Sequence, residues 1–204
     1  MRFVVLLVLV AGCKDQAPEP AKPIPAVQPS GTPPMKTTHA PGKATLEALA
    51  ALPQPGFTPR IRKLDDGFLD VELTGTDITV TVVVSACVAC KPIQLDAARA
   101  DRDALAITVP PELRDRGDTV VEIGEASLGG AKVIEVYQLA RTDEAASHAV
   151  VVYFNDGVTQ LRVIAAYAGP APPTRDELAR IVPRARLEQV ALGFAEAITQ
   201  AWAR

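Results

Sequence analysis

The strongest constraint on the fold is a period-two alternation of apolar and polar residues, which recurs between residues 68 and 167. In the first such segment Leu69, Val71 and Leu73 share one side. Asp70 and Glu72 share the other side. This alternation is typical of a β-strand with one buried and one solvated face. The segments with strand character are 68–73, 78–85, 120–123, 132–139, 149–154 and 158–167.

Turn sequences separate neighbouring strands. Residues 74–77 and 129–130 contain glycine, and Asn155, Asp156 and Gly157 form the strongest turn signal. Asn, Asp and Gly tolerate the positive φ that tight hairpin turns require. Strands joined by hairpins are antiparallel, so the sequence predicts a mainly antiparallel sheet.

The C-terminal part has a helical pattern instead. Thr174 and Glu177 have the spacing of a capping box, which marks a helix start. Pro183 interrupts this helix and is suited to open a second one as its first residue. Apolar residues then recur every three or four positions in one stripe, which we expect to pack on the sheet rather than to bind a partner. The stripe comprises Leu187, Val190, Ala191, Phe194, Ile198 and Trp202.

These elements predict an α+β domain, in which C-terminal helices pack on a mainly antiparallel β-sheet. The order of the elements is similar to that of the PsbP-like domains. We expect this single domain to span residues 44–204, which is long enough for one core and short for two.

Residues 14–43 differ from the domain in composition. They hold eight of the eighteen prolines of the chain and no aromatic residue. Such a stretch cannot bury enough apolar surface to offset the entropy of ordering it. We expect a disordered, proline-rich tether over residues 13–43, rather than a peptide-recognition motif.

Residues 1–12 have the pattern of an export signal. Arg2 is followed by an apolar run over residues 3–10 and then by Ala11 and Gly12. The run is too short for a transmembrane helix, which needs about 20 residues. A basic start, an apolar middle and small residues at the end are typical of a secretory signal peptide.

The residues Val10, Ala11, Gly12 and Cys13 resemble the lipobox of bacterial lipoproteins. The resemblance implies cleavage before Cys13, a diacylglycerol on its sulfur and acyl chains such as palmitate. Two or three acyl chains hold a protein stably at a bilayer, so the lipid bilayer is the expected partner of this anchor. In that family an Asp directly after the cysteine signals inner-membrane retention. Lys14 holds that place, which favours the outer membrane, with the domain in the periplasm.

With Cys13 lipidated, Cys87 and Cys90 remain. In an exported protein we expect them to form a disulfide. They follow a predicted strand and precede a helix predicted over residues 93–98, an order that resembles thioredoxin-like oxidoreductases. The resemblance implies that Cys87 is the attacking thiol and Cys90 the resolving one, because a helix N-terminus favours the thiolate.

Three interpretations of this pair stay open. A local structural disulfide is favoured, because Ala86 stands where the thioredoxin-like family has an aromatic residue and because Pro110 and Pro111 come too early for the family's proline. A redox centre is the second interpretation. A metal site is the third, although zinc prefers four ligands and only His148 is spare.

Other catalytic signatures are few. Ser147 and His148 are adjacent, and adjacent residues of a strand point to opposite faces. The sequence has no Gly-x-Ser-x-Gly elbow and no phosphate-binding loop, dinucleotide fingerprint or His-Glu-x-x-His motif. The net charge of −3 argues against a general nucleic-acid binder.

The expected function is therefore that of a membrane-anchored cell-envelope lipoprotein with a non-enzymatic binding or scaffold domain. We expect no cofactor besides the lipid on Cys13, no metal and no nucleic acid. The sequence does not specify whether the ligand is a protein or a small molecule. The alternative is a tethered thiol–disulfide oxidoreductase that uses Cys87 and Cys90.

The anchor has a direct test. We predict that Cys13→Ser leaves the precursor unprocessed by the lipoprotein route and without acyl chains, because no sulfur is present to carry the lipid. Fatty-acid labelling and mass spectrometry of the N-terminus measure this. The same label on the variant, or an intact Met1 on the wild-type protein, would contradict the assignment.

Overall fold

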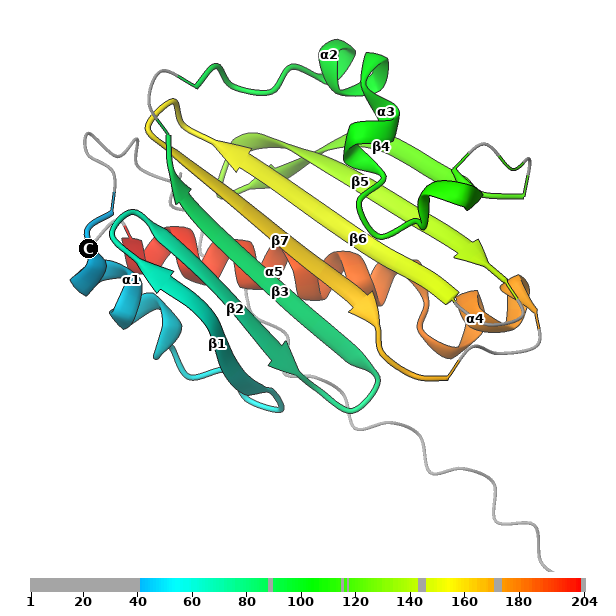
Figure 1. The fold of residues 1–204 in the computed structure, drawn as a ribbon, viewed down its shortest axis with the longest axis horizontal. Helices are drawn as coiled ribbons and strands as arrows, with labels where there is room; N and C mark the ends of the chain where they lie inside the picture. The colour runs from blue at the N-terminus through cyan, green and yellow to red at the C-terminus, as the bar shows by residue number, and fades with distance from the viewer. Residues whose placement is uncertain are drawn as a thin grey trace, which may run out of the picture.

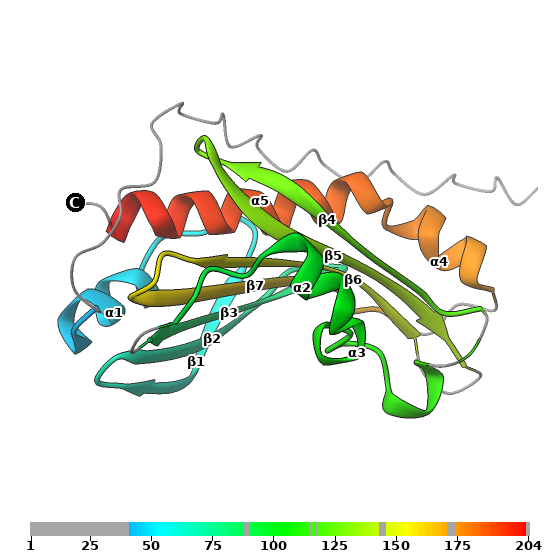
Figure 2. The ribbon, with the colours of Figure 1, turned by 90° about the horizontal axis from the view of Figure 1, so that it is seen from above.

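The computed structural model describes residues 41–87, 90–114, 116, 118–142, 146–170 and 174–202. The predicted signal peptide, Cys13 and the tether up to residue 40 lie outside the described residues. Helices lie on both faces of one sheet (Figures 1 and 2). The strands are β1 (Thr58–Asp65), β2 (Phe68–Thr74), β3 (Ile78–Ala86), β4 (Val120–Leu128), β5 (Ala131–Arg141), β6 (Ala146–Asn155) and β7 (Thr159–Tyr167). The helices are α1 (Lys43–Ala50), α2 (Leu95–Ala100), α3 (Arg102–Leu105), α4 (Arg175–Ile181) and α5 (Arg184–Trp202), with a 3-10 turn η1 (Pro111–Leu113).

The sheet has seven strands in the order β1-β2-β3-β7-β6-β5-β4, and every neighbouring pair is antiparallel. Two meanders, β1–β3 and β4–β7, meet where β3 pairs with β7. The α+β prediction with C-terminal helices on an antiparallel sheet is therefore confirmed.

The main core lies between the sheet and the helices α1, α4 and α5. Buried and half-exposed residues alternate along β2 and β3, as the sequence predicts. Phe57 packs edge-on against Phe194 of α5, with ring centroids 5.1 Å apart. The α5 residues that face the sheet are buried apart from Trp202, which is partly buried. This confirms that the apolar stripe of the last helix packs on the sheet.

The opposite face of the sheet carries the connection from β3 to β4, which includes α2, α3 and η1 (Figure 2). Ala98 of α2 packs on Ile134, Val136 and Val151. Buried Gln138 of β5 anchors the loop that follows α3. Its Oε1 accepts hydrogen bonds from the Thr108 backbone N–H at 2.9 Å and from the Thr108 hydroxyl at 2.6 Å. The connection therefore covers the sheet over β4, β5 and β6.

The predicted turn between β6 and β7 is confirmed. Gly157 has a φ of 94°, and its N–H donates to Asn155 Oδ1 at 2.8 Å. Asp156 Oδ1 accepts from the Val158 N–H at 2.9 Å. Positive φ is the reason a glycine suits this place.

The helix signals near the C-terminus are also confirmed in part. Thr174 caps α4, because its Oγ1 accepts from the Glu177 N–H at 3.1 Å. Pro183 lies directly before α5 rather than as its first residue, because α5 begins at Arg184. The carbonyl of Pro183 accepts from the Arg186 N–H at 2.9 Å.

The elements α1, β1, α3 and η1 have no counterpart in the sequence prediction. The strand β1 is an edge strand with exposed residues on both sides, so it lacks an alternating pattern. It contains an irregularity between Ile61 and Lys63, and bulges and lysines are typical of protected sheet edges. β4 extends to Leu128, beyond the predicted end at residue 123. Gly124 falls within it, and glycine weakens a strand pattern in sequence.

Among the described residues, no helix combines the length and the apolar character needed to cross a membrane.

Candidate functional site

The sheet face opposite α5 is covered unevenly. The connection from β3 to β4 lies over β4, β5 and β6, whereas no described helix lies over β2 and β3 (Figure 1). We call the surface over β2, β3 and β7 the open face. No side chain of the open face is buried. Its residues are Phe68, Asp70, Glu72, Thr79, Thr81, Val83, Ser85, Gln160, Arg162, Ile164 and Ala166.

One row of cross-strand partners crosses the open face and continues onto β6. Asp70 of β2 pairs with Val83 of β3, and Val83 pairs with Arg162 of β7. Arg162 in turn pairs with Tyr153 of β6. Cross-strand partners lie on the same face and their side chains are close neighbours. The register therefore places a carboxylate, a guanidinium and a phenol in one line.

These three polar side chains share an uncommon property. Asp70 Oδ1, Arg162 Nε and Tyr153 Oη are each buried from solvent and have no hydrogen-bond partner. A buried polar atom without a partner costs about 1–3 kcal/mol. Most such atoms in proteins are paired, so a group of them calls for a reason. Because these three atoms are buried, a ligand on the surface would contact only the parts of Asp70 and Arg162 that remain exposed.

Arg162 differs from the other half-buried arginines of the described chain. Arg102, Arg114 and Arg186 donate hydrogen bonds to carbonyls or carboxylates, as do Arg175 and Arg184, and Arg141 also has a partner. Within the described residues, no hydrogen bond or ion pair holds Arg162. A guanidinium carries donors that match a carboxylate or phosphate, so this side chain is free to bind an anion.

Tyr153 adds a hydrogen-bond donor beside Arg162. The ring packs at the edge of the cluster formed by Ala98, Ile134 and Val151. Burial raises the pKa of Tyr153 to about 12, although the nearby charge of Arg162 opposes that shift. The phenol therefore keeps its proton at neutral pH and donates rather than only accepts.

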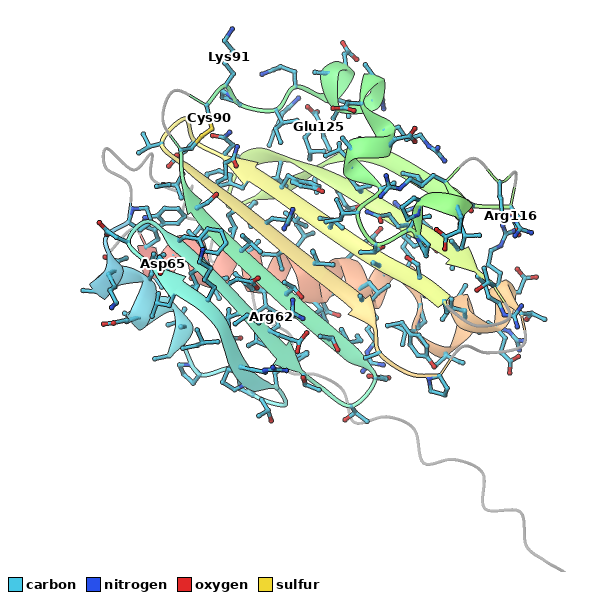
Figure 3. All side chains as sticks on the ribbon, in the orientation of Figure 1. Arg62, Asp65, Cys90, Lys91, Arg116 and Glu125 are labelled. Atoms are coloured by element: carbon cyan, nitrogen blue, oxygen red, sulfur yellow. A yellow bond between two sulfur atoms is a disulfide. The ribbon has the colours of Figure 1, made fainter. Side chains whose placement is uncertain are left out.

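Cys87 and Cys90 form a disulfide with a Cα–Cα distance of 5.7 Å, at one end of the open face (Figure 3). The Cys87 N–H donates to the Val158 carbonyl at 2.8 Å. Gln160 Nε2 donates to Cys90 Sγ at 3.3 Å. Asn155 Nδ2 donates to the Lys91 carbonyl at 3.2 Å. The disulfide loop is thus attached to the β6–β7 hairpin, and both cysteines are half-exposed.

The helix after the cysteines differs from the sequence prediction. It begins at Leu95 rather than at Ile93, and it ends at Ala100. The first backbone hydrogen bond of this turn runs from the Ala98 N–H to the Gln94 carbonyl at 2.8 Å. Residues 91–94, which include Pro92, therefore separate Cys90 from a helix of only six residues. The cysteines do not begin the helix as they do in the thioredoxin-like order.

Ser147 and His148 lie within β6 and point to opposite faces. The Ser147 hydroxyl lies 2.8 Å from the Thr108 hydroxyl, under the β3–β4 connection. His148 Nε2 lies 3.2 Å from Tyr137 Oη, in the core below α4 and α5. Their separation rules out a joint catalytic role, and the structure places neither of them on the open face.

Tyr137 also contacts Arg184 at the start of α5, with the guanidinium 4.4 Å from the ring centroid. Arg184 pairs with Glu122, Glu135 and Glu188. Burial raises the pKa of Glu135, and the negative charge of Glu188 adds to the effect. This cluster ties α5 to β4 and β5, so we assign it a structural role.

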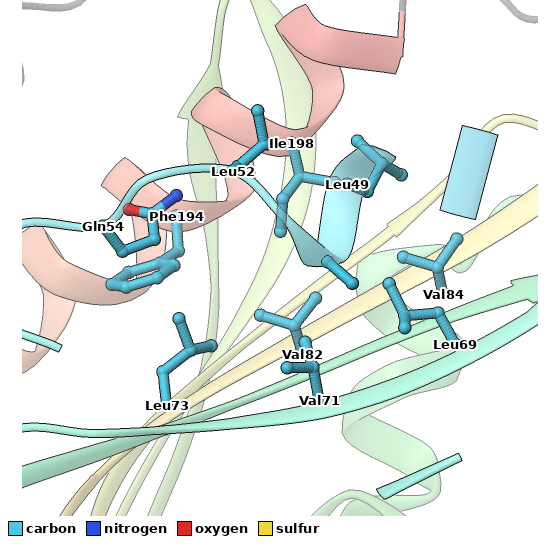
Figure 4. Close-up of a pocket in the computed structure, with 11 residues that line it drawn as sticks. Leu49, Leu52, Gln54, Leu69, Val71, Leu73, Val82, Val84, Phe194 and Ile198 are labelled. Atoms are coloured by element: carbon cyan, nitrogen blue, oxygen red, sulfur yellow. The ribbon is translucent and has the colours of Figure 1, made fainter. Parts of the chain in front are cut away.

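An apolar crevice lies between α1, the sheet and α5 (Figure 4). Leu49, Leu69, Val84 and Ile198 are among its lining residues, and Gln54 is the polar one. The crevice has room for about one water molecule. It is a packing gap in the core and too small for an organic ligand.

The described residues bring together no group of three or more His, Cys, Asp or Glu side chains that could hold a metal ion. No family model, no curated protein and no solved structure matches the chain. The similarity to PsbP-like domains therefore stays a prediction from element order.

The sequence contained part of the signal for the open face. The alternation of β7 places Gln160 and Arg162 opposite its apolar side, and Asp70 likewise lies on the polar side of β2. The neighbourhood of Asp70, Arg162 and Tyr153 was missed, because it depends on the pairing of β3 with β7.

The buried histidine generates a prediction. Burial lowers the pKa of His148 below its ordinary value of 6.5, so the unfolded chain takes up a proton at a higher pH than the folded one. The stabilisation from neutral His148 is present above pH 6.5 and declines as the pH falls toward the folded-state pKa. We expect the free energy of unfolding of the wild type to fall more between pH 7.5 and 5.5 than that of His148→Gln.

Urea unfolding at both pH values measures this difference. Effects of carboxylates such as Glu135, whose raised pKa acts in the opposite direction, are common to both proteins and cancel in the comparison. Equal losses of stability in wild type and variant would contradict a neutral, buried His148.

Proposed function

We propose that this chain is a lipid-anchored protein of the cell envelope and that its domain is a non-enzymatic binding module. The observation that carries the binding role is Arg162, a half-buried guanidinium without a hydrogen bond or ion pair among the described residues. It lies on β7, where the part of the sheet face covered by the β3–β4 connection meets the part that no described helix covers.

The anchor rests on the sequence. The apolar run over residues 3–10 and the lipobox residues before Cys13 support export and lipidation. The proline-rich residues 14–43 would hold the domain away from the bilayer. A fully extended tether of this length reaches roughly 90 Å at about 3.1 Å per residue. Lys14 favours the outer membrane over the inner one, with the open face in the periplasm.

The open face supports binding rather than catalysis. Its described side chains include hydroxyls, an amide and the carboxylates of Asp70 and Glu72, but no histidine and no free thiol. Thr79, Thr81 and Ser85 therefore have no neighbouring imidazole to act as their general base. Arginine and tyrosine, by contrast, are residues that contribute strongly to binding energy in interfaces.

A site-specific cross-linking experiment tests this role. We predict that a photo-reactive amino acid at Thr81, in the centre of the open face, gives discrete cross-linked products in the native envelope. The same amino acid at Gln189, which is exposed on α5, serves as the matched control and gives none. Arg162→Glu should reduce the Thr81 products about tenfold, which corresponds to about 1.4 kcal/mol of binding energy.

Melting curves show whether the Arg162→Glu protein is folded. A folded variant with unchanged Thr81 products would contradict the binding role, as would equal products at both positions.

A tethered thiol–disulfide oxidoreductase is the second candidate. One observation favours it, namely that Cys87 and Cys90 are half-exposed rather than buried. The short helix α2 and residues 91–94 before it favour a structural disulfide instead, because a helix N-terminus adjacent to the attacking thiol is what stabilises its thiolate.

The reduction potential of the disulfide separates the two roles. We expect a value below about −300 mV, which is typical of structural disulfides, whereas catalytic pairs lie between about −120 and −270 mV. Cys87→Ser and Cys90→Ser should lower the melting temperature and leave the cross-linking from Thr81 unchanged. A potential in the catalytic range, together with reduction of insulin disulfides by the wild type, would establish the enzyme instead.

A further inference from the structure

Two opposite charges of the open face lie on either side of Val83. Asp70 and Arg162 are both cross-strand partners of this valine, one on β2 and one on β7. Neighbouring strands are about 4.8 Å apart, so the two backbones are about 10 Å from each other. The side chains do not form an ion pair with each other. Val83 provides a small apolar floor between them.

The charges around this pair are already neutralised by other partners. Glu72 forms an ion pair with Arg62. Lys63, the cross-strand partner of Asp70, instead pairs with Asp65 at 3.0 Å. The Lys63 ammonium also lies 5.2 Å from the centroid of the Phe68 ring. The Lys63 ammonium is therefore directed away from Asp70. The Asp70 carboxylate has no cation as its partner among the described residues.

We propose that Asp70 and Arg162 together bind the zwitterionic head of an amino acid, with its ammonium on Asp70 and its carboxylate on Arg162. This inference rests on the proposed role of the open face as a binding surface and specifies the ligand chemistry. The Tyr153 hydroxyl lies beside Arg162 but is buried from solvent, so we assign it no contact with the ligand.

The charge pattern selects this chemistry over simpler ligands. An anion alone would satisfy Arg162 and would leave the Asp70 carboxylate unpaired, at the cost of repulsion between two negative groups. A cation alone would leave Arg162 unpaired. A group that carries both charges a few ångströms apart satisfies Asp70 and Arg162 at once.

The open face sets no limit on what the zwitterionic head is attached to. Thr81 and Ser85 flank Val83 on β3 and are half-exposed. A substituent on the ligand is therefore free to extend over the sheet. The head group belongs either to a free amino acid or to the end of a longer chain. An example of the second is a peptide side chain that ends in a free α-ammonium and α-carboxylate.

The experiment is an NMR titration of the full-length chain in detergent micelles, monitored at the backbone amides of β3. The probes are glycine as a free zwitterion and Nε-acetyl-lysine as a zwitterion at the end of a longer chain. Acetate and methylammonium each carry one of the two charges and serve as controls. We expect both zwitterions to bind about tenfold more tightly than either control, since each charge-assisted contact contributes at least that factor.

Variants locate the binding. Asp70→Asn and Arg162→Gln should each weaken the binding of glycine about tenfold and abolish its advantage over the single-charge probes. Tyr153→Phe should bind glycine like the wild type, because the buried hydroxyl does not contact the ligand. The matched controls are Asp66→Asn in the β1–β2 turn and Arg60→Gln on β1, both exposed, and both should bind glycine like the wild type.

The outcomes are distinct. Tighter binding of glycine supports a free amino acid as the source, and tighter binding of Nε-acetyl-lysine supports the end of a longer chain. Acetate that binds as tightly as glycine, with no effect of Asp70→Asn, would overturn the zwitterion. The absence of binding by any probe would also overturn it, while cross-links from Thr81 that depend on Arg162 would preserve the proposed binding role. If no probe binds and the cross-links from Thr81 do not depend on Arg162, both the zwitterion site and the binding role of the open face are rejected.

Discussion

The pairing of β3 with β7 is the interaction on which the rest of the structure depends. The strands β1–β3 and β4–β7 are local meanders, and the β3–β7 ladder is the hydrogen-bonded connection between them. It aligns Val82 with Val163 and Val84 with Leu161, so that both meanders present one continuous apolar surface to α5. Without this ladder each meander would expose a strand edge and a hydrophobic face, both of which favour aggregation.

The same pairing creates the open face. The chain leaves β3 and crosses to the far edge of the sheet at β4, so its short helices cover β4, β5 and β6. Hydrogen bonds between the residues at the disulfide and Val158, Gln160 and Asn155 hold the start of this crossing on the β6–β7 hairpin. Gln138 holds its later part on β5. The covered and uncovered halves of the sheet therefore meet near Tyr153 and Arg162, where the three polar side chains without partners lie.

Local patterns predicted some elements better than others. The alternation along β2 and β3 and the cap at Thr174 are short-range features, and the structure contains them where they were expected. The edge strand β1 was missed, because a strand without a buried face has no alternation to detect. The start of α2 was placed two residues too early, because hydrophobic periodicity does not define where the first helical hydrogen bond forms. The sequence pattern showed which residues of the open face are polar, but it did not show that Asp70 and Arg162 lie near each other.

The sequence by itself determined that this chain forms antiparallel strands with terminal helices, and it determined which side of each strand is polar. Both follow from a period of two or of three to four residues, which the neighbours along the chain impose. The tertiary structure alone decided that Asp70 lies across Val83 from Arg162 and that Tyr153 lies beside it. Those neighbourhoods arise from the register between distant strands, and the joint burial of their apolar sides beneath α5 selects that register, because a slip by one residue would turn those sides to water.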